Sequence, residues 1–121
     1  MALPSDPRAF RFEPRKMISA PGQFGKSSLE PRPVDGASHD DPRFKASRLQ
    51  HLIANAAREA MLEQGHTLKS FTDEFTAPGM TYDRLVRIHR GESLMQLADL
   101  VNLASLFPQV RALLQSEIVW A

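Results

Sequence analysis

The chain of 121 residues contains no cysteine, so it can form neither a disulfide nor a thiolate zinc site. It also lacks any run of about 18 apolar residues, the length that a membrane-spanning helix needs. The most apolar segment, 94–107, is interrupted by Gln96, Asp99 and Asn102. The first residues lack the apolar core of a secretion signal. We therefore expect a soluble protein of the cytoplasm that does not enter a membrane.

Proline is scarce in the second part of the chain and concentrated in the first. Seven of the nine prolines lie within residues 1–45, and only Pro78 and Pro108 follow. Residues 1–45 also show no sustained apolar period, so few side chains can offset the entropy of ordering them. We predict a Pro/Arg-rich arm, disordered or extended and flexible, over 1–45 and one domain over 46–121. A domain of about 75 residues is small enough to gain from oligomerisation.

The chain has almost no excess charge of either sign, with a net charge of +1. Residues 1–45 hold eight Lys or Arg against six acidic residues, and residues 46–121 hold seven against eight. A domain without net positive charge is a poor non-specific binder of nucleic acid. Any DNA contact therefore requires a local cationic face.

Apolar residues recur at spacings of three and four throughout 46–121, which is typical of amphipathic helices. We predict an all-α fold with five helices at about 46–64, 68–75, 82–90, 94–107 and 109–119. The expected boundary residues are the N-caps Asp41, Thr67 and Thr81, the terminating Gly65 and Gly91, a Ser93–Gln96 capping box, and Pro108 opening the last helix.

The helix predicted at 82–90 has two chemically different sides. At about 100° per residue, the inward residues are Thr81, Leu85 and Ile88, and the outward ones are Asp83, Arg87 and Arg90, with Arg84 and Val86 beside them. An outward arginine can donate two hydrogen bonds to a guanine, worth about 1–3 kcal/mol of base discrimination. A tight helix pair whose second helix projects cations is typical of major-groove recognition.

Several residues from 67 to 107 form a pattern found in one group of DNA-binding proteins. They are Thr67-Leu68, Gly79-Met80-Thr81 in the turn, Leu85 and Ile88, the Arg-Ile-His-Arg-Gly run ending at Gly91, and Leu97, Leu100 and Ala104. This pattern resembles the helix-turn-helix of the Cro and phage-repressor type, the XRE family, over roughly half the chain (about 48–107). The chain differs at Thr72, where the family usually has alanine, and in a turn lengthened at 76–78.

The resemblance implies a five-helix helix-turn-helix domain that binds an operator, commonly as a two-fold dimer. The base-contacting positions would be Tyr82, Asp83, Arg84 and Arg87, and the phosphate-contacting positions Thr67, Lys69, Thr81 and Arg90. We expect a homodimer with a surface formed by Leu106, Phe107, Leu114, Ile118 and Trp120. The expected function is a sequence-specific regulator of transcription that binds double-stranded DNA, from a bacterium, phage or mobile element, and associates with the nucleoid.

Other chemical signals in the sequence are weak. Segment 20–27 fits a loose phosphate-loop pattern, but the prolines around it leave no strand and helix to hold a nucleotide. His39-Asp40-Asp41 precedes Pro42, where Asp41 suits a helix cap better than a metal ligand. The other histidines are single. We expect no metal, no cofactor and no enzymatic activity.

The arm leaves a second function open. Its cations, Arg8, Arg11, Arg15, Lys16 and Lys26, could follow DNA phosphates. Its apolar residues, Phe10, Phe12, Met17 and Phe24, could instead dock on a partner protein. In that case the protein would be an antitoxin-like or adaptor module with weak or no DNA binding.

Overall fold

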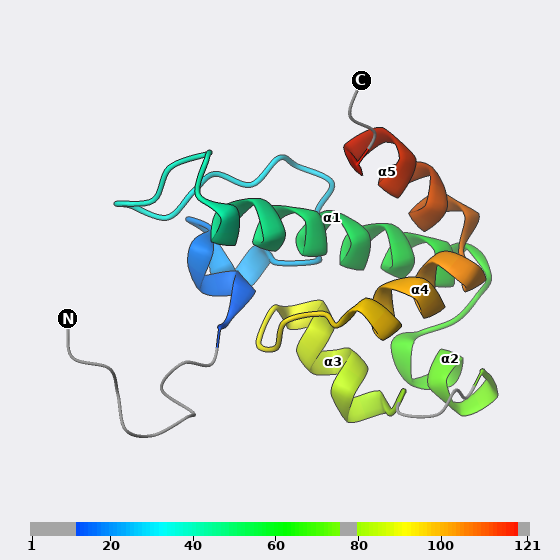
Figure 1. Cartoon of the computed structure of the whole chain (residues 1–121). Coiled ribbons are helices and arrows are strands. Elements are labelled where there is room, and N and C mark those ends of the chain that lie inside the picture. Colours follow the sequence, from blue (N-terminus) through cyan, green and yellow to red (C-terminus); the bar gives the residue numbers. More distant parts are fainter. Residues whose placement is uncertain (1–11, 76–79, 119–121) are drawn as a thin grey trace.

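A computed structural model describes residues 12–75 and 80–118, and the fold is all-α (Figure 1). Its elements are the 3₁₀ turns η2 (Pro14–Met17) and η3 (Pro21–Gln23) and the helices α1 (Pro42–Glu63), α2 (Leu68–Glu74), α3 (Tyr82–Arg90), α4 (Leu97–Leu106) and α5 (Pro108–Ile118). Within the described ranges there is no β-strand, and an isolated bridge joins Ile18 and Pro33. The prediction of an all-α fold with five helices is confirmed.

Most of the predicted helix boundaries are confirmed by local hydrogen bonds and backbone angles. The Asp41 carboxylate accepts a hydrogen bond from the Arg43 amide at 2.8 Å, which fixes the start of α1. The hydroxyls of Thr67 and Thr81 cap α2 and α3 in the same way. Gly65 and Gly91 follow α1 and α3 with φ of 79° and 72°, a left-handed conformation that glycine adopts without strain.

The predicted start of the fourth helix is wrong. Helix α4 begins at Leu97 rather than near residue 94, and its capping box pairs Gln96 with Asp99 instead of Ser93 with Gln96. The cause lies on α1, where the side chain of Gln50 donates to the Ser93 carbonyl at 2.9 Å and accepts from the Met95 amide at 2.7 Å. These bonds hold residues 93–95 outside the helix.

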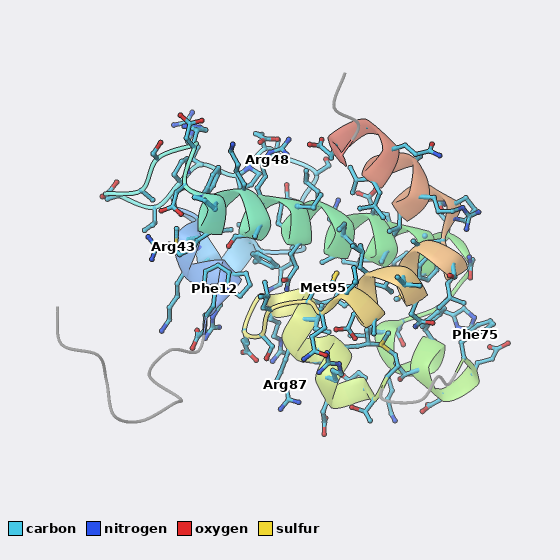
Figure 2. The ribbon with its side chains drawn as sticks, in the orientation of Figure 1. Phe12, Arg43, Arg48, Phe75, Arg87 and Met95 are labelled. Atoms are coloured by element: carbon cyan, nitrogen blue, oxygen red, sulfur yellow. The ribbon has the colours of Figure 1, made fainter. Side chains whose placement is uncertain are left out.

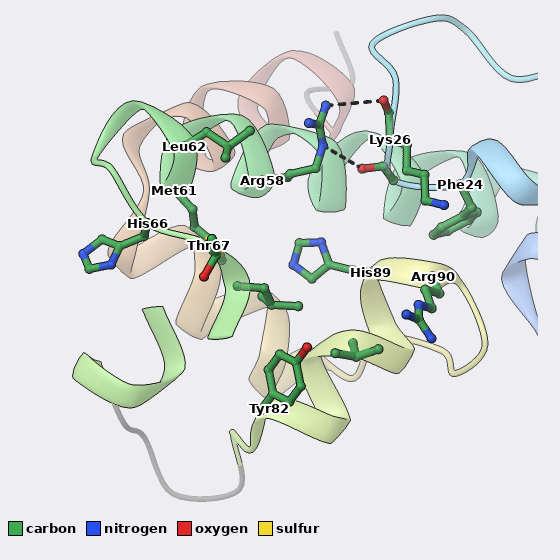
Figure 3. A pocket seen from close by; sticks show the side chains of 13 residues that line it. Phe24, Lys26, Arg58, Met61, Leu62, His66, Thr67, Tyr82, His89 and Arg90 are labelled. Carbon is green, nitrogen blue, oxygen red and sulfur yellow. Dashed lines mark hydrogen bonds between the residues drawn. The ribbon is translucent and has the colours of Figure 1, made fainter. Parts of the chain in front are cut away.

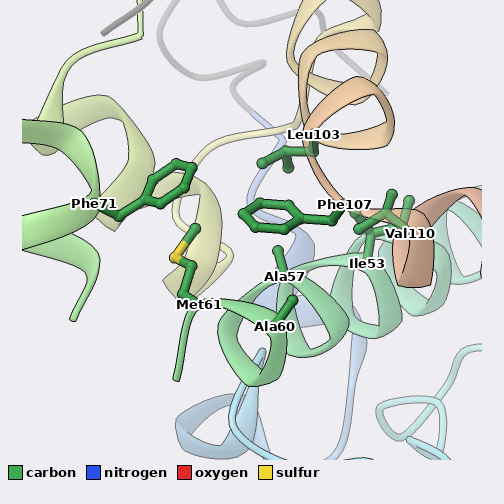
Figure 4. Close-up of a cluster of buried hydrophobic side chains, with 8 residues drawn as sticks. All are labelled: Ile53, Ala57, Ala60, Met61, Phe71, Leu103, Phe107 and Val110. Carbon is green, nitrogen blue, oxygen red and sulfur yellow. The ribbon is translucent and has the colours of Figure 1, made fainter. Parts of the chain in front are cut away.

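Helix α1 is the centre of the fold, and α2, α3 and α5 all pack against it (Figure 1). The main core lies between α1, α2, α4 and α5 (Figure 4). Its buried residues are Ile53, Ala57, Ala60, Met61, Phe71, Leu103, Phe107 and Val110. The rings of Phe71 and Phe107 face each other at 5.3 Å between centroids. Small alanines on α1 let both rings approach the helix closely.

The predicted boundary between a flexible arm and a domain at residues 45 and 46 does not match the described chain. Residues 12–41 are irregular, but they lie along the amino-terminal half of α1 (Figure 1). Ile18 and Phe24 form a second small core with Phe44, the first aromatic residue of α1. Backbone hydrogen bonds from Ser19 to Arg32 and from Val34 to Met17 tie the segment to itself.

A few apolar groups are sufficient to order this segment because α1 already presents a surface for them. Ile18 and Phe24 are 3% and 1% exposed. Burial of each side chain contributes about 1.5–3 kcal/mol, which offsets much of the ordering entropy of a short loop. Residues 1–11, which include the arm cations Arg8 and Arg11, lie outside the described part.

Candidate nucleic-acid interface

Helix α3, predicted as the recognition helix, forms between a threonine cap and a left-handed glycine. The Thr81 hydroxyl accepts a hydrogen bond from the Arg84 amide at 3.2 Å, and Gly91 ends the helix. Leu85 and Ile88 are fully buried, as predicted from the helical period. Thr81, which was expected on the same inward side, is exposed because it lies at the cap rather than in the helix.

The carboxyl end of α3 is held in place by one buried side chain of α1. The Gln50 amide donates to the Ile88 carbonyl at 3.0 Å, in addition to its bonds with Ser93 and Met95. Gln50 is 3% exposed, so these bonds form away from solvent. Sequence analysis missed this residue because a glutamine on a helix is usually solvated. Its amide fixes where α3 ends and how the chain turns into α4.

The amino-terminal segment holds the same end of α3 from another side. The Arg15 amide donates to the Gly91 carbonyl at 3.0 Å. A Cβ atom on Gly91 would lie 2.8 Å from the Phe24 ring, so only glycine allows this close packing. The Gly25 amide donates to Nδ1 of His51 at 2.8 Å, which anchors the loop to α1. These contacts join residues far apart in the chain, so no local pattern predicts them.

The outward side of α3 carries two arginines that make no ion pair within the described residues. Arg87 and Arg90 are both exposed, and the side chain of Arg87 points away from the body of the protein (Figure 2). Asp83 and Tyr82 are exposed one turn or more earlier on the same helix. Leu85 and Ile88 anchor the opposite side. The predicted division into an apolar inner face and a cationic outer face is therefore present.

Arg84 is not part of this free cationic face. Its guanidinium makes a bidentate ion pair with Asp99 of α4, with Nε 3.1 Å from one carboxylate oxygen and Nη2 2.5 Å from the other. Asp99 is 5% exposed and also accepts from the Gln96 amide. The carboxylate raises the pKa of Arg84 above its ordinary value. Arg84 therefore joins α3 to α4, and its predicted contact with DNA bases is not supported by this geometry.

The predicted phosphate-contacting residues at the start of α2, Thr67 and Lys69, are exposed. They differ in whether their polar atoms are free to bind a phosphate. The Thr67 hydroxyl accepts from the Ser70 amide and lies 3.3 Å from the Ser70 hydroxyl, so both its roles are used locally. Lys69 lies 3.0 Å from Asp73 and 5.3 Å from the centre of the Tyr82 ring. An exposed ion pair of this kind is worth about 0–1 kcal/mol, so it can be exchanged for another anion.

Thr72 occupies the middle of α2, where the family that the sequence resembles usually has alanine. It is 6% exposed, and its hydroxyl donates to the Lys69 carbonyl at 2.9 Å. The polar atom is therefore satisfied within its own helix, and α2 still packs against α3. The lengthened turn at 76–78 lies outside the described residues.

The predicted dimer surface is partly wrong. Phe107 is 1% exposed and belongs to the core of the monomer, so it cannot contact a second copy. Leu114 is half-buried and packs against the same core, whereas Leu106 is 37% exposed. The side chain of Ile118 and all of Trp120 lie outside the described part. The most exposed apolar side chains of α4 are instead Leu97 and Val101, at 75% and 58%.

The described residues contain no cluster of three or more His, Asp or Glu side chains that could hold a metal ion. Segment 20–27 contains the η3 turn and packs against α1 and α3. Gly25 allows this close packing, because an added Cβ atom there would clash with the backbone of His89. Among the described helices, none has the length and apolarity to cross a membrane. Comparison with protein-family models, curated proteins and solved structures finds no significant match.

Proposed function

We propose that this protein binds double-stranded DNA in a sequence-specific way and regulates transcription in a bacterium, phage or mobile element. The observation that carries the proposal is the pair Arg87 and Arg90, exposed and free of ion pairs in the described structure on one side of α3. The other side of this helix is fixed by Leu85 and Ile88. A helix whose apolar side is packed on the protein and whose exposed side carries cations can enter the major groove of B-DNA.

The two arginines would have different tasks in such a complex. Arg87 lies near the middle of the outward side, where a guanidinium can reach O6 and N7 of a guanine. Arg90 lies in the last turn, closer to where a DNA backbone would pass, and would bind phosphate. Tyr82 and Asp83, one turn before Arg87, are placed to contact neighbouring bases. The Thr81 hydroxyl accepts from the Arg84 amide and donates to none of the described residues, so its proton would be available for a phosphate.

Recognition of a palindromic operator would require two copies of the chain. The exposed Leu97 and Val101 are four residues apart on α4 and therefore lie on one face of that helix. Single exposed leucines need no explanation, but an adjacent pair on one helix favours contact with another protein. A two-fold dimer through this face would place two α3 helices at successive major grooves, about 34 Å apart.

Selection from random DNA followed by salt-titrated binding tests the proposal directly. The wild-type protein should enrich a defined sequence. Arg87→Ala should relax the preference at one base position, at a cost of about 1–3 kcal/mol for the preferred base. Arg90→Ala should weaken binding to all sequences about evenly and reduce the salt slope by about one unit.

The matched control is Arg32→Ala, because Arg32 is an exposed arginine of the amino-terminal segment and not part of α3. This variant should retain wild-type affinity and preference. If the wild type enriches no sequence, or if all three variants behave alike, direct reading by α3 is excluded.

An adaptor or antitoxin-like module is the second candidate function. The exposed Leu97 and Val101 favour it, because a partner protein could cover them as well as a second copy could. Docking through the arm has less support, since Phe24 is buried and Met17 packs on the same small core. Co-purification of a partner that is lost in Leu97→Glu, with no sequence enriched from random DNA, would favour this function over the first.

A further inference from the structure

A cavity of about 220 Å³ lies between α1, α2, α3 and the loop that follows η3 (Figure 3). It borders the outward side of α3, although Arg87 is not among the residues that line it. Helix α3 contributes Tyr82, Val86, His89 and Arg90 to its wall. The cavity therefore adjoins the surface proposed to contact DNA, because Tyr82 and Arg90 belong to both.

One residue of the cavity wall carries a buried polar atom that has no partner among the described residues. The Nε2 atom of His89 is shielded from solvent and makes no hydrogen bond with any described residue. Figure 3 shows the imidazole projecting from α3 between Arg58 and Tyr82. Burial, with a smaller contribution from Arg58, lowers the pKa of His89 to about 4, so the ring is neutral at pH 7. Buried nitrogen atoms are nearly always hydrogen-bonded, and an exception calls for a partner.

The rest of the wall is mainly apolar and aromatic. Leu62, Met61 and Val86 provide aliphatic surface, and Phe24, Tyr82 and His66 provide rings. A cavity of about 150 Å³ is enough to hold benzene. The space between these side chains therefore suits a single aromatic ring with one or two small substituents. Aromatic side chains around a ring add favourable edge-to-face contacts.

The charge of the wall is of one sign. Lys26, Arg58 and Arg90 line the cavity, and no Asp or Glu is among the lining residues. Arg58 is held in place because its guanidinium donates to the Gly25 and Lys26 carbonyls at 3.2 and 3.4 Å (Figure 3) and to Oδ1 of Asn55 at 2.7 Å. Glu59 lies 4.0 Å from its Nη2 atom, and Nη1 bonds to none of the described residues, so Nη1 is the atom available to a ligand. An oriented guanidinium beside a lysine is suited to bind a carboxylate.

We infer that this cavity binds a small aromatic carboxylate that also carries a hydroxyl group. The ring lies against Leu62 and Val86, the carboxylate faces Arg58 and Lys26, and the hydroxyl bonds to Nε2 of His89. A hydroxyl fits either tautomer of the imidazole because it both donates and accepts. The site does not depend on DNA binding, and its occupation would bring a ligand into contact with four residues of α3.

The test uses the full chain labelled with ¹⁵N-histidine and titrated with 4-hydroxybenzoate as the probe. The ¹⁵N signal of His89 Nε2 should shift in a saturable way, with a Kd of about 0.1–1 mM for a ligand of this size. Two analogues separate the contributions. Benzoate lacks the hydroxyl and 4-hydroxybenzyl alcohol lacks the carboxylate, and each should bind at least about fivefold more weakly.

A variant that fills the cavity gives an independent result. Leu62 is 54% exposed, so Leu62→Trp should preserve the core and place a ring in the site, abolishing the shift. Leu29→Trp, at a residue 76% exposed on the amino-terminal segment and not among those lining the cavity, is the matched control and should bind as the wild type does. Absence of a His89 shift up to about 10 mM probe, or equal binding by Leu62→Trp, would overturn the assignment. Neither result depends on whether the chain binds DNA.

Discussion

Three arginines of α3 have the same chemistry but different surroundings, and the surroundings decide what each can do. Arg84 is paired with the buried carboxylate of Asp99, whereas Arg87 and Arg90 extend from the surface. A guanidinium held by two hydrogen bonds stabilises the contact of two helices. A free one is available for a ligand. Removal of each should therefore affect different properties of the protein.

We predict that Arg84→Ala lowers the free energy of unfolding by about 2 kcal/mol, because it leaves the buried Asp99 carboxylate without its cation. Arg87→Ala removes an exposed side chain from the same helix and should change stability by less than about 0.5 kcal/mol. Urea unfolding followed by circular dichroism measures both values. Equal effects from the two variants would contradict the roles assigned here.

Burial of His89 makes the stability of the protein depend on pH. The folded protein keeps this imidazole neutral down to a pKa of about 4, whereas the unfolded chain protonates it near 6.5. The unfolded state therefore binds more protons between these values, and the free energy of unfolding falls as the pH falls through this window. The loss attributable to His89 should reach about 2–3 kcal/mol.

Urea unfolding of the wild type and His89→Gln between pH 6.5 and about 4 measures this contribution. The variant should lose less stability over the window, by about the amount that His89 contributes. Burial also lowers the pKa of His51, but that residue is present in both proteins and cancels in the comparison. Parallel stability curves for the two proteins would show that His89 is not buried as described.

Among the elements, the amino-terminal segment is a structural support of α3 rather than a free arm. Its tightest contact is at Gly25, where an added Cβ atom would lie 2.4 Å from the His89 carbonyl oxygen and 3.3 Å from Cβ of Ala54. The loop therefore fits between α1 and the last turn of α3. A substitution in this loop should therefore change the position of α3 at the candidate interface, although no loop residue belongs to that interface.

We predict that Gly25→Ala lowers the free energy of unfolding by about 3 kcal/mol or more. The left-handed backbone costs about 1–2 kcal/mol for alanine, and the methyl group adds a clash with backbone atoms. Gly36→Ala is the matched control, since Gly36 has a φ of 86° but no atom within 4 Å of an added Cβ. It should cost only the backbone strain. Thermal or urea unfolding distinguishes the two, and similar losses would mean that the loop does not pack on α3.

At the scale of the whole molecule, the relevant property is the oligomeric state. The described domain is small, and α4 exposes Leu97 and Val101 to solvent. We predict that the wild type is a dimer and that Leu97→Glu with Val101→Glu produces a monomer of unchanged fold. Its affinity for a palindromic operator should fall at least about tenfold, because the two half-sites are no longer bound by one particle.

Sedimentation velocity and operator binding measure these effects. Leu29→Glu serves as the control, because Leu29 is 76% exposed on the amino-terminal segment and lies apart from α4. This variant should remain a dimer with wild-type affinity. A wild-type protein that is monomeric at tens of micromolar would contradict the prediction, as would a double variant that keeps the wild-type mass.

The helical part of the fold could be predicted from sequence because its determinants are local. The apolar period placed Leu85 and Ile88 inside α3, and the caps Asp41, Thr67 and Thr81 fixed where helices begin. Capping hydrogen bonds join residues two or three positions apart, so the pattern is complete within a short window of sequence. The two sides of α3 follow from the same period.

Tertiary structure alone decided the features that join distant residues. Arg84 and Arg87 look equivalent in sequence, and only the approach of α4 makes one a structural ion pair. Phe107 was predicted on the dimer surface because it ends an apolar segment. In the structure its side chain is buried in the core beside Phe71. Gln50 and the amino-terminal segment act on α3 across long stretches of chain. Such contacts depend on which helices meet and where, and the spacing of residues within one element predicts its buried side but not its neighbour.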